Sequence, residues 1–224
     1  YFECHETLEE IWQEEELFEH FCGLLRTARP KRPLDAVLVV LPASSLVGDD
    51  KQSPDKLKES SEDLYQRLLK LQQILTLRLP TYVLVSKGDT IPGFTAFCGG
   101  LSSNQREQLA GWSSPYPINV PYDPAWVDQA FAELYRTQCG LQIDLLASAR
   151  LSDKEQDAAF LLPRNTQALR DPVKLILDQL FRVNVRIASS RPASVNGYIR
   201  SFISSLISFV DCEYPQCCSG VGFS

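Results

Sequence analysis

The sequence contains no methionine, not even at its first position, and only two histidines among 224 residues. The missing methionine indicates either a segment of a longer protein or a sequence from which methionines have been lost. No apolar run approaches the roughly 18 residues that a membrane-spanning helix needs, and no signal peptide precedes the first helical pattern. We therefore expect the chain, as written, to be soluble.

Metal ligands and catalytic groups are also scarce. A structural zinc site needs four nitrogen or sulfur ligands, and the clustered cysteines near the carboxyl end have no histidine close to them in sequence (Cys212, Cys217 and Cys218). His20 and Cys22 are two positions apart in a predicted helix, where side chains point away from each other. No H-E-x-x-H and no G-x-S-x-G motif is present. We predict no metal site and no catalytic residues.

The composition is that of a globular protein, because 44% of the residues are apolar. A formal charge of −6 and a pI near 5.0 argue against nucleic acid as a partner. The remaining cysteines are scattered beside apolar residues, which is typical of reduced, buried cysteine in the cytosol (Cys4, Cys22, Cys98 and Cys139).

A strand, a long helix and a second strand are predicted between residues 35 and 85. Residues 35–41 (DAVLVVL) form a nearly unbroken apolar run, which predicts a strand buried on both faces of a parallel sheet. A polar loop is expected over 44–53, and leucines recur at helical spacing from 57 to 75. Residues 81–85 then predict a strand parallel to the first, and α/β folds bind ligands where such a strand ends.

The loop after the second strand is the candidate site, in the sequence TYVLVSKGD of residues 81–89. A strand that ends in Lys-x-Asp is how P-loop GTPase folds grip a guanine base: the carboxylate accepts two hydrogen bonds and the lysine stem covers the ring. Ser86, Lys87 and Asp89 are therefore the predicted nucleotide-binding residues. The structural alternative is a turn in which Gly88 permits the tight backbone and Asp89 caps the next helix. No G-x-x-x-x-G-K-[ST] loop occurs in the chain.

The remaining segments are predicted to be mainly helical. Residues 6–28 form a helix at the amino end, and one or two short helices follow Gly93. Asp123-Pro124 begins a long helix that reaches about Arg150, and its predicted apolar stripe includes Tyr135.

Further helices are predicted towards the carboxyl end. Residues 152–155 (SDKE) form a capping box, and Pro163 ends the helix that it opens. Residues 166–182 form another helix with a break at Asp171-Pro172. An amphipathic helix is predicted over 199–210, either as a satellite core element or as a partner-binding or membrane-surface helix; the basic flank that is typical of a membrane-surface helix is missing.

Several motifs, in this order, resemble the IcmF/TssM family of inner-membrane proteins of type VI secretion systems, which has a relative in type IVB systems. The matching segments are residues 29–40 (RPKRPLDAVLVV), 79–89 (LPTYVLVSKGD), 93–94 (GF), 162–163 (LP), 169–172 (LRDP) and 180–182 (LFR). The resemblance covers about residues 25–182. Ser86 departs from the family's usual threonine and from the asparagine of true GTPases, whose amide braces the phosphate loop.

The resemblance implies a partial P-loop-GTPase-like parallel sheet followed by a mainly α-helical subdomain. The expected divisions are residues 1–112 for the second half of an α/β domain, 113–182 for the helical subdomain and 183–224 for a tail. The family implies a domain at the cytoplasmic face of the bacterial inner membrane. The implied partners are a TssL/DotU-type membrane protein, a TssJ-type lipoprotein contacted through the parent protein, and baseplate components.

Three functions remain open from the sequence. The leading one is a scaffold segment of the secretion membrane complex that acts through protein contacts, binds no cofactor itself and does not hydrolyse GTP. The second is a nucleotide switch, with GTP or ATP and magnesium held by a phosphate loop upstream of Tyr1. The third is a small regulatory adaptor that uses the 199–210 segment.

Overall fold

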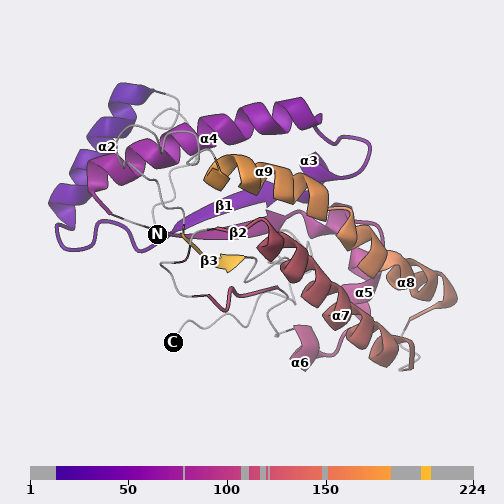
Figure 1. The fold of residues 1–224 in the computed structure, drawn as a ribbon. Helices are drawn as coiled ribbons and strands as arrows, with labels where there is room; N and C mark the ends of the chain where they lie inside the picture. Colours follow the sequence, from indigo (N-terminus) through magenta and orange to yellow (C-terminus); the bar gives the residue numbers. More distant parts are fainter. Residues whose placement is uncertain are drawn as a thin grey trace.

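The computed structural model describes residues 14–77, 79–106, 111–116, 120, 122–147, 151–182 and 198–202. The fold is mixed α/β, with a small parallel sheet and mostly helical segments around it (Figure 1). The elements in chain order are α2 (Glu15–Ala28), β1 (Val37–Pro42), α3 (Ala43–Leu46), α4 (Pro54–Leu75), β2 (Pro80–Ser86), the 3-10 turn η1 (Gly88–Thr90), α5 (Phe94–Gly100), α6 (Ser103–Arg106), α7 (Ala125–Ala147), α8 (Asp153–Gln167), α9 (Arg170–Arg182) and β3 (Tyr198–Phe202).

The sheet has the strand order β1-β2-β3, and both described pairings are parallel. Val39 pairs with Val83 and Leu41 with Val85, so the predicted strand, long helix and strand are confirmed. β3 occupies residues for which an amphipathic helix was predicted. That prediction is wrong over 199–202, because a short apolar run fits a strand as well as a helix. Residues 203–210 lie outside the described part of the chain.

The two faces of β1 differ, so the prediction that this strand is buried on both faces is wrong. Val39 and Leu41 are buried, whereas Leu38 is 57% exposed and Val40 is 48% exposed. An apolar run is compatible with burial of either face, and only the packing of other elements decides between them. The described elements bury the face of β1 that carries Val39 and Leu41.

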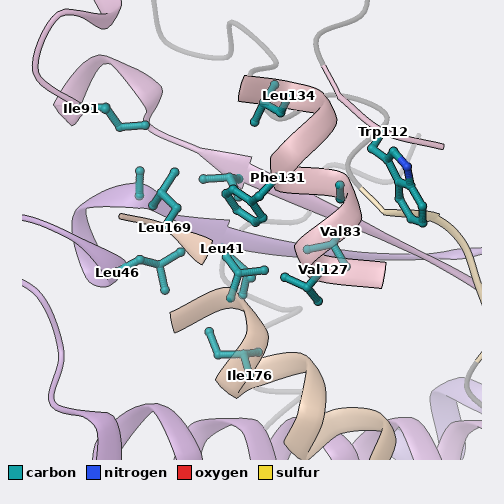
Figure 2. Packing of buried hydrophobic residues seen from close by; sticks show 14 of the residues in the cluster. Leu41, Leu46, Val83, Ile91, Trp112, Val127, Phe131, Leu134, Leu169 and Ile176 are labelled. Atoms are coloured by element: carbon teal, nitrogen blue, oxygen red, sulfur yellow. The ribbon is translucent and has the colours of Figure 1, made fainter. Parts of the chain in front are cut away.

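One core joins the sheet to the helices that follow it in the chain. Figure 2 shows Leu41 and Val83 from the strands gathered with Val127 and Phe131 from α7 and Ile176 from α9. α9 also packs along α4 and contacts α7. The described residues before and after residue 112, the expected boundary between the α/β domain and the helical subdomain, therefore share one core. The division into domains stays a prediction.

A smaller cluster attaches α2 to α4. Phe18 and Cys22 of α2 are buried against Leu71 and Leu75 of α4. Lys70 hydrogen-bonds Glu15 and pairs with Glu19 at 2.7 Å, closing the edge of this contact. The ammonium of Lys70 lowers the pKa of the Glu15 carboxyl, since it stabilises the charged form.

The predicted helix ends are partly confirmed. The Glu155 carboxylate accepts from the Ser152 amide at 2.9 Å, and the Ser152 side chain accepts from the Glu155 amide, as a capping box requires. The Ser152 hydroxyl also donates to the Glu155 carboxylate at 2.6 Å. Asp123 Oδ1 accepts from the Ala125 amide at 2.9 Å at the start of α7. The predicted polar loop contains a short helix, α3, which its serine-rich sequence did not indicate.

Pro163 does not end its helix, contrary to the prediction. α8 continues to Gln167 with Pro163 buried inside it, and the break before α9 falls at residues 168–169 rather than at Asp171-Pro172. Proline cannot donate to the carbonyl four residues earlier, which is that of Ala159. Gln142 of α7 provides a substitute donor: its Nε2 lies 2.7 Å from the Phe160 oxygen and 3.4 Å from the Ala159 oxygen.

α7 therefore presents amides where its sequence predicted only an apolar stripe. A buried polar layer lies between the two helices and consists of Gln138 and Gln142 of α7 and Thr166 of α8. Gln138 Nε2 donates to Thr166 Oγ1 at 3.3 Å, while Gln138 Oε1 has no partner within the described residues. Tyr135, placed on the apolar stripe by its spacing, is 43% exposed.

Replacing Gln142 by leucine removes the only side-chain donor described for the Ala159 and Phe160 carbonyls. We expect Gln142→Leu to lower the free energy of unfolding by about 1–3 kcal/mol, the usual cost of buried groups left without partners. Urea denaturation followed by circular dichroism would measure this. Gln138→Leu is the matched control and should cost less, because its carbonyl oxygen is already unpaired. Equal losses for both variants would contradict the role given to Gln142.

Candidate functional site

The candidate site is the loop that leaves the carboxyl end of β2. Ser86, the last residue of β2, pairs with Pro42, so the loop begins beside the point where β1 enters α3. η1 then contacts both α3 and α5. The structure thus places Ser86, Lys87 and Asp89 together at the sheet edge where parallel α/β folds bind ligands.

Lys87 adopts a left-handed backbone conformation, with φ 53° and ψ 44°. Its carbonyl accepts hydrogen bonds from the Thr90 amide at 3.1 Å and the Thr90 hydroxyl at 2.7 Å. Gly88 has no positive φ and is instead buried at the start of η1. The predicted role of Gly88 as the residue that permits the unusual backbone is therefore wrong, since Lys87 has that conformation.

Asp89 does not cap the next helix. It lies in the first turn of η1, and α5 begins only at Phe94, with Gly93 as its N-cap residue. The structural alternative for Asp89 is thus wrong: a 3-10 turn lies between the Lys-x-Asp sequence and the helix.

The Lys87 and Asp89 side chains are exposed, Ser86 is half-buried and Gly88 is buried. Within the described ranges, neither the Lys87 ammonium nor the Asp89 carboxylate has a hydrogen-bond or ion-pair partner. An unpaired carboxylate can accept two hydrogen bonds from a planar ligand, and the lysine stem can lie over its ring. The arrangement is suited to recognition, and its role in binding a nucleotide remains a prediction.

α8 fixes the far end of the loop through its backbone and one amide. Asn165 Nδ2 donates to the Pro92 carbonyl at 2.9 Å. Gly93 has φ 89°, and a Cβ built on it would lie 2.1 Å from the Ala158 oxygen. Sequence analysis marked Gly93 through the family motif but missed Ala158 and Asn165, which are about 70 residues further along and carry no motif of their own.

The close approach of Gly93 to α8 predicts intolerance of any side chain. Gly93→Ala should lower the free energy of unfolding by about 2–4 kcal/mol, because it combines a positive φ with overlap against backbone. Chemical denaturation would measure the loss. Gly99→Ala in α5 is the control, because nothing lies within 4 Å of the added carbon, and alanine is the better helix former. A Gly93→Ala variant as stable as that control would contradict the described contact.

The left-handed backbone of Lys87 predicts a stabilising substitution. Lys87→Gly should raise the free energy of unfolding by up to about 1 kcal/mol, because glycine adopts a positive φ without steric cost. Lys87→Ala, which keeps the strain and removes only the charge, should change it by less than about 0.5 kcal/mol. Thermal denaturation of both variants would measure the difference, and destabilisation by Lys87→Gly would contradict this view of the turn.

Other kinds of site find little support in the described part of the chain. No group of three or more metal-ligating side chains comes together there. Cys22, Cys98 and Cys139 are free thiols, and burial raises the pKa of the Cys22 thiol. No described helix is long and apolar enough to cross a membrane.

Comparison with known families identifies the chain's relatives. A model of the IcmF-related N-terminal domain matches residues 12–199. The chain belongs to the IcmF-related family. The type VI secretion system component TssM1 of Pseudomonas aeruginosa strain PAO1 is 27% identical over 169 residues. No solved structure matches the chain.

The match confirms the resemblance to the IcmF/TssM family. The aligned region covers 73% of this chain but only 15% of the TssM1 sequence, so the chain spans a small part of that relative. The family match includes β1, β2, the Lys87–Asp89 loop and the helices that pack against them.

Proposed function

We propose that this IcmF-related domain is a scaffold segment of a bacterial secretion membrane complex and acts through protein-protein contacts. The observation that carries the proposal is the match to TssM1, which is named as a component of a type VI secretion system. The proposal extends to a position at the cytoplasmic face of the inner membrane. It also extends to contacts with TssL/DotU-type and TssJ-type proteins and baseplate components through the parent protein.

Exposed apolar side chains on a well-packed framework support a role in protein contacts. On β1, Leu38 and Val40 are about half exposed, and on α7 and α8 the side chains of Ile143 and Phe160 are 69% and 61% exposed. Contiguous apolar patches mark interaction sites, and Leu38 and Val40, two residues apart, lie on the same face of β1.

A second candidate is a nucleotide-dependent switch, in which Asp89 and Lys87 recognise the base and upstream residues hold GTP or ATP with magnesium. The observation in its favour is the strained backbone of Lys87, because strain of this kind gathers at functional sites. The unpaired, exposed carboxylate of Asp89 is compatible with base recognition.

Calorimetry separates the two candidates. The full cytoplasmic segment of the parent protein, including residues that precede Tyr1, would be titrated with GTP and with ATP in the presence of magnesium. The scaffold proposal predicts no binding of either nucleotide. Magnesium-dependent GTP binding that Asp89→Ala abolishes would favour the switch.

A second test examines assembly in cells. The parent protein carrying Asp89→Ala would be assayed for type VI secretion and for co-purification with its TssL-type partner. The scaffold proposal predicts that both remain at the level of the unchanged protein. Gly93→Ala is the contrasting variant, since damage to the fold should reduce both. Loss of secretion in Asp89→Ala, with a normal amount of protein, would contradict the scaffold proposal.

A further inference from the structure

Helix α2 carries a second apolar stripe beside its contact with α4. Leu17, Phe21, Leu24 and Ala28 recur at spacings of four, three and four residues, and we call these four residues the α2 seam. Leu17 is 40% exposed, Leu24 is 55% exposed, Ala28 is exposed and Phe21 is half-buried. Figure 1 shows α2 at the margin of the fold, with α4 along one side.

The seam adjoins the contact that attaches α2 to the domain and overlaps it at Phe21, which packs against the cluster between α2 and α4. Phe18 and Cys22 are the buried residues of α2 and belong to the cluster with α4. With about 100° between successive residues, Leu17, Leu24 and Ala28 lie on a strip beside that buried pair. The apolar arc of α2 is therefore wider than its described contact requires.

The charges at the two ends of α2 are opposite. Glu14, Glu15 and Glu16 stand at its amino end, while Arg26 and Lys31 lie in and just after its last turn. All five are exposed, but Glu15 pairs with Lys70 of α4 and Arg26 donates to the Ile74 carbonyl at 3.4 Å. Glu14, Glu16 and Lys31 are the charges of this set with no partner among the described residues. Arg29 and Arg32 add to the basic end, although both pair with Asp35, at 3.6 and 2.6 Å.

The four seam residues have the same spacing whether the helix is followed from its amino end or from its carboxyl end. These spacings are symmetric about a point between Cys22 and Gly23, and the acidic and basic ends are exchanged by the same reversal. In an antiparallel pair of such helices, Leu17 would face Ala28 of the other copy and Phe21 would face Leu24. Apolar residues at spacings of three and four are the pattern that helices use to pack against each other.

We propose that the α2 seam is a contact with α2 of a second copy of this chain, arranged antiparallel about a two-fold axis. Such an isologous contact needs one surface that is complementary to itself. A parallel pair would place Glu14 and Glu16 of both copies together, whereas the antiparallel pair places them at the end of the helix where Lys31 of the other copy lies. Charge complementarity therefore favours a second copy in this orientation.

The contact involves one helix from each copy, so the association is weak. We expect a dissociation constant of roughly 10 to 500 μM. Sedimentation equilibrium of the full 224-residue chain, at concentrations up to about 1 mM, is the primary measurement. A chain that stays monomeric throughout this range would overturn the proposal.

Two leucines provide a matched pair of variants. Leu24→Glu places a charge in the seam and should raise the dissociation constant at least about tenfold. Leu161→Glu introduces the same charge at a leucine of α8 that is 47% exposed and should leave it unchanged. Circular dichroism would establish that both variants remain folded. Equal weakening by both, or none by Leu24→Glu, would overturn the proposal.

Charge reversal tests the antiparallel orientation itself. Glu14→Lys alone and Lys31→Glu alone should each weaken the association by about twofold to fivefold, because each brings like charges together across the contact. The double variant should restore it. The antiparallel pairing would be overturned if neither single variant changed the dissociation constant, or if the double variant associated more weakly than both single variants. Monomers that co-sediment with vesicles containing phosphatidylglycerol would assign the seam to a membrane and would also overturn the proposal.

Discussion

The arrangement of this domain depends on the backbone of α8, where carbonyl groups that a regular helix would use internally make contacts with other elements. The Ala158 oxygen lies against Gly93, and the Ala159 and Phe160 oxygens accept from Gln142. Pro163 leaves the Ala159 oxygen without its usual donor, and the Gln142 amide lies 3.4 Å from that oxygen. One irregular helix thereby joins the loop after β2 to the long helix α7.

The loop after β2 combines strain with support. Lys87 holds an unfavourable backbone conformation, and the hydrogen bonds of Thr90 to its carbonyl stabilise it. Further along, Asn165 holds Pro92 in place. The exposed side chains of Lys87 and Asp89 thus lie on a turn that Thr90 holds from within and that α8 holds at its far end. Such preorganisation lowers the free-energy cost of binding a ligand.

Sequence patterns predicted most of the helices and strands, but they did not predict which side chains of those helices and strands are buried or what they contact. The parallel strands, α4, α7 and the capping box at Ser152 follow from periodicity and local chemistry, which act over a few residues. The exposure of Leu38, the burial of Gln142 and the passage of α8 through Pro163 depend on partners far away in the chain. For the candidate site, the sequence predicted Ser86, Lys87 and Asp89, and their role stays a prediction. The left-handed conformation of Lys87 and the contacts to α8 depend on packing that no local pattern encodes.

The spacing of contacts along α8 limits how the family can change at this position. Within the span from Ala158 to Thr166, successive backbone and side-chain groups meet Gly93 at the start of α5, α7 and the loop at Pro92. Inserting or deleting one residue there would rotate every later group by about 100°. Gly93 and Gln142 would then face the wrong groups. Related chains should therefore differ in length in the connections between helices, while this segment of α8 keeps its length even where its side chains vary.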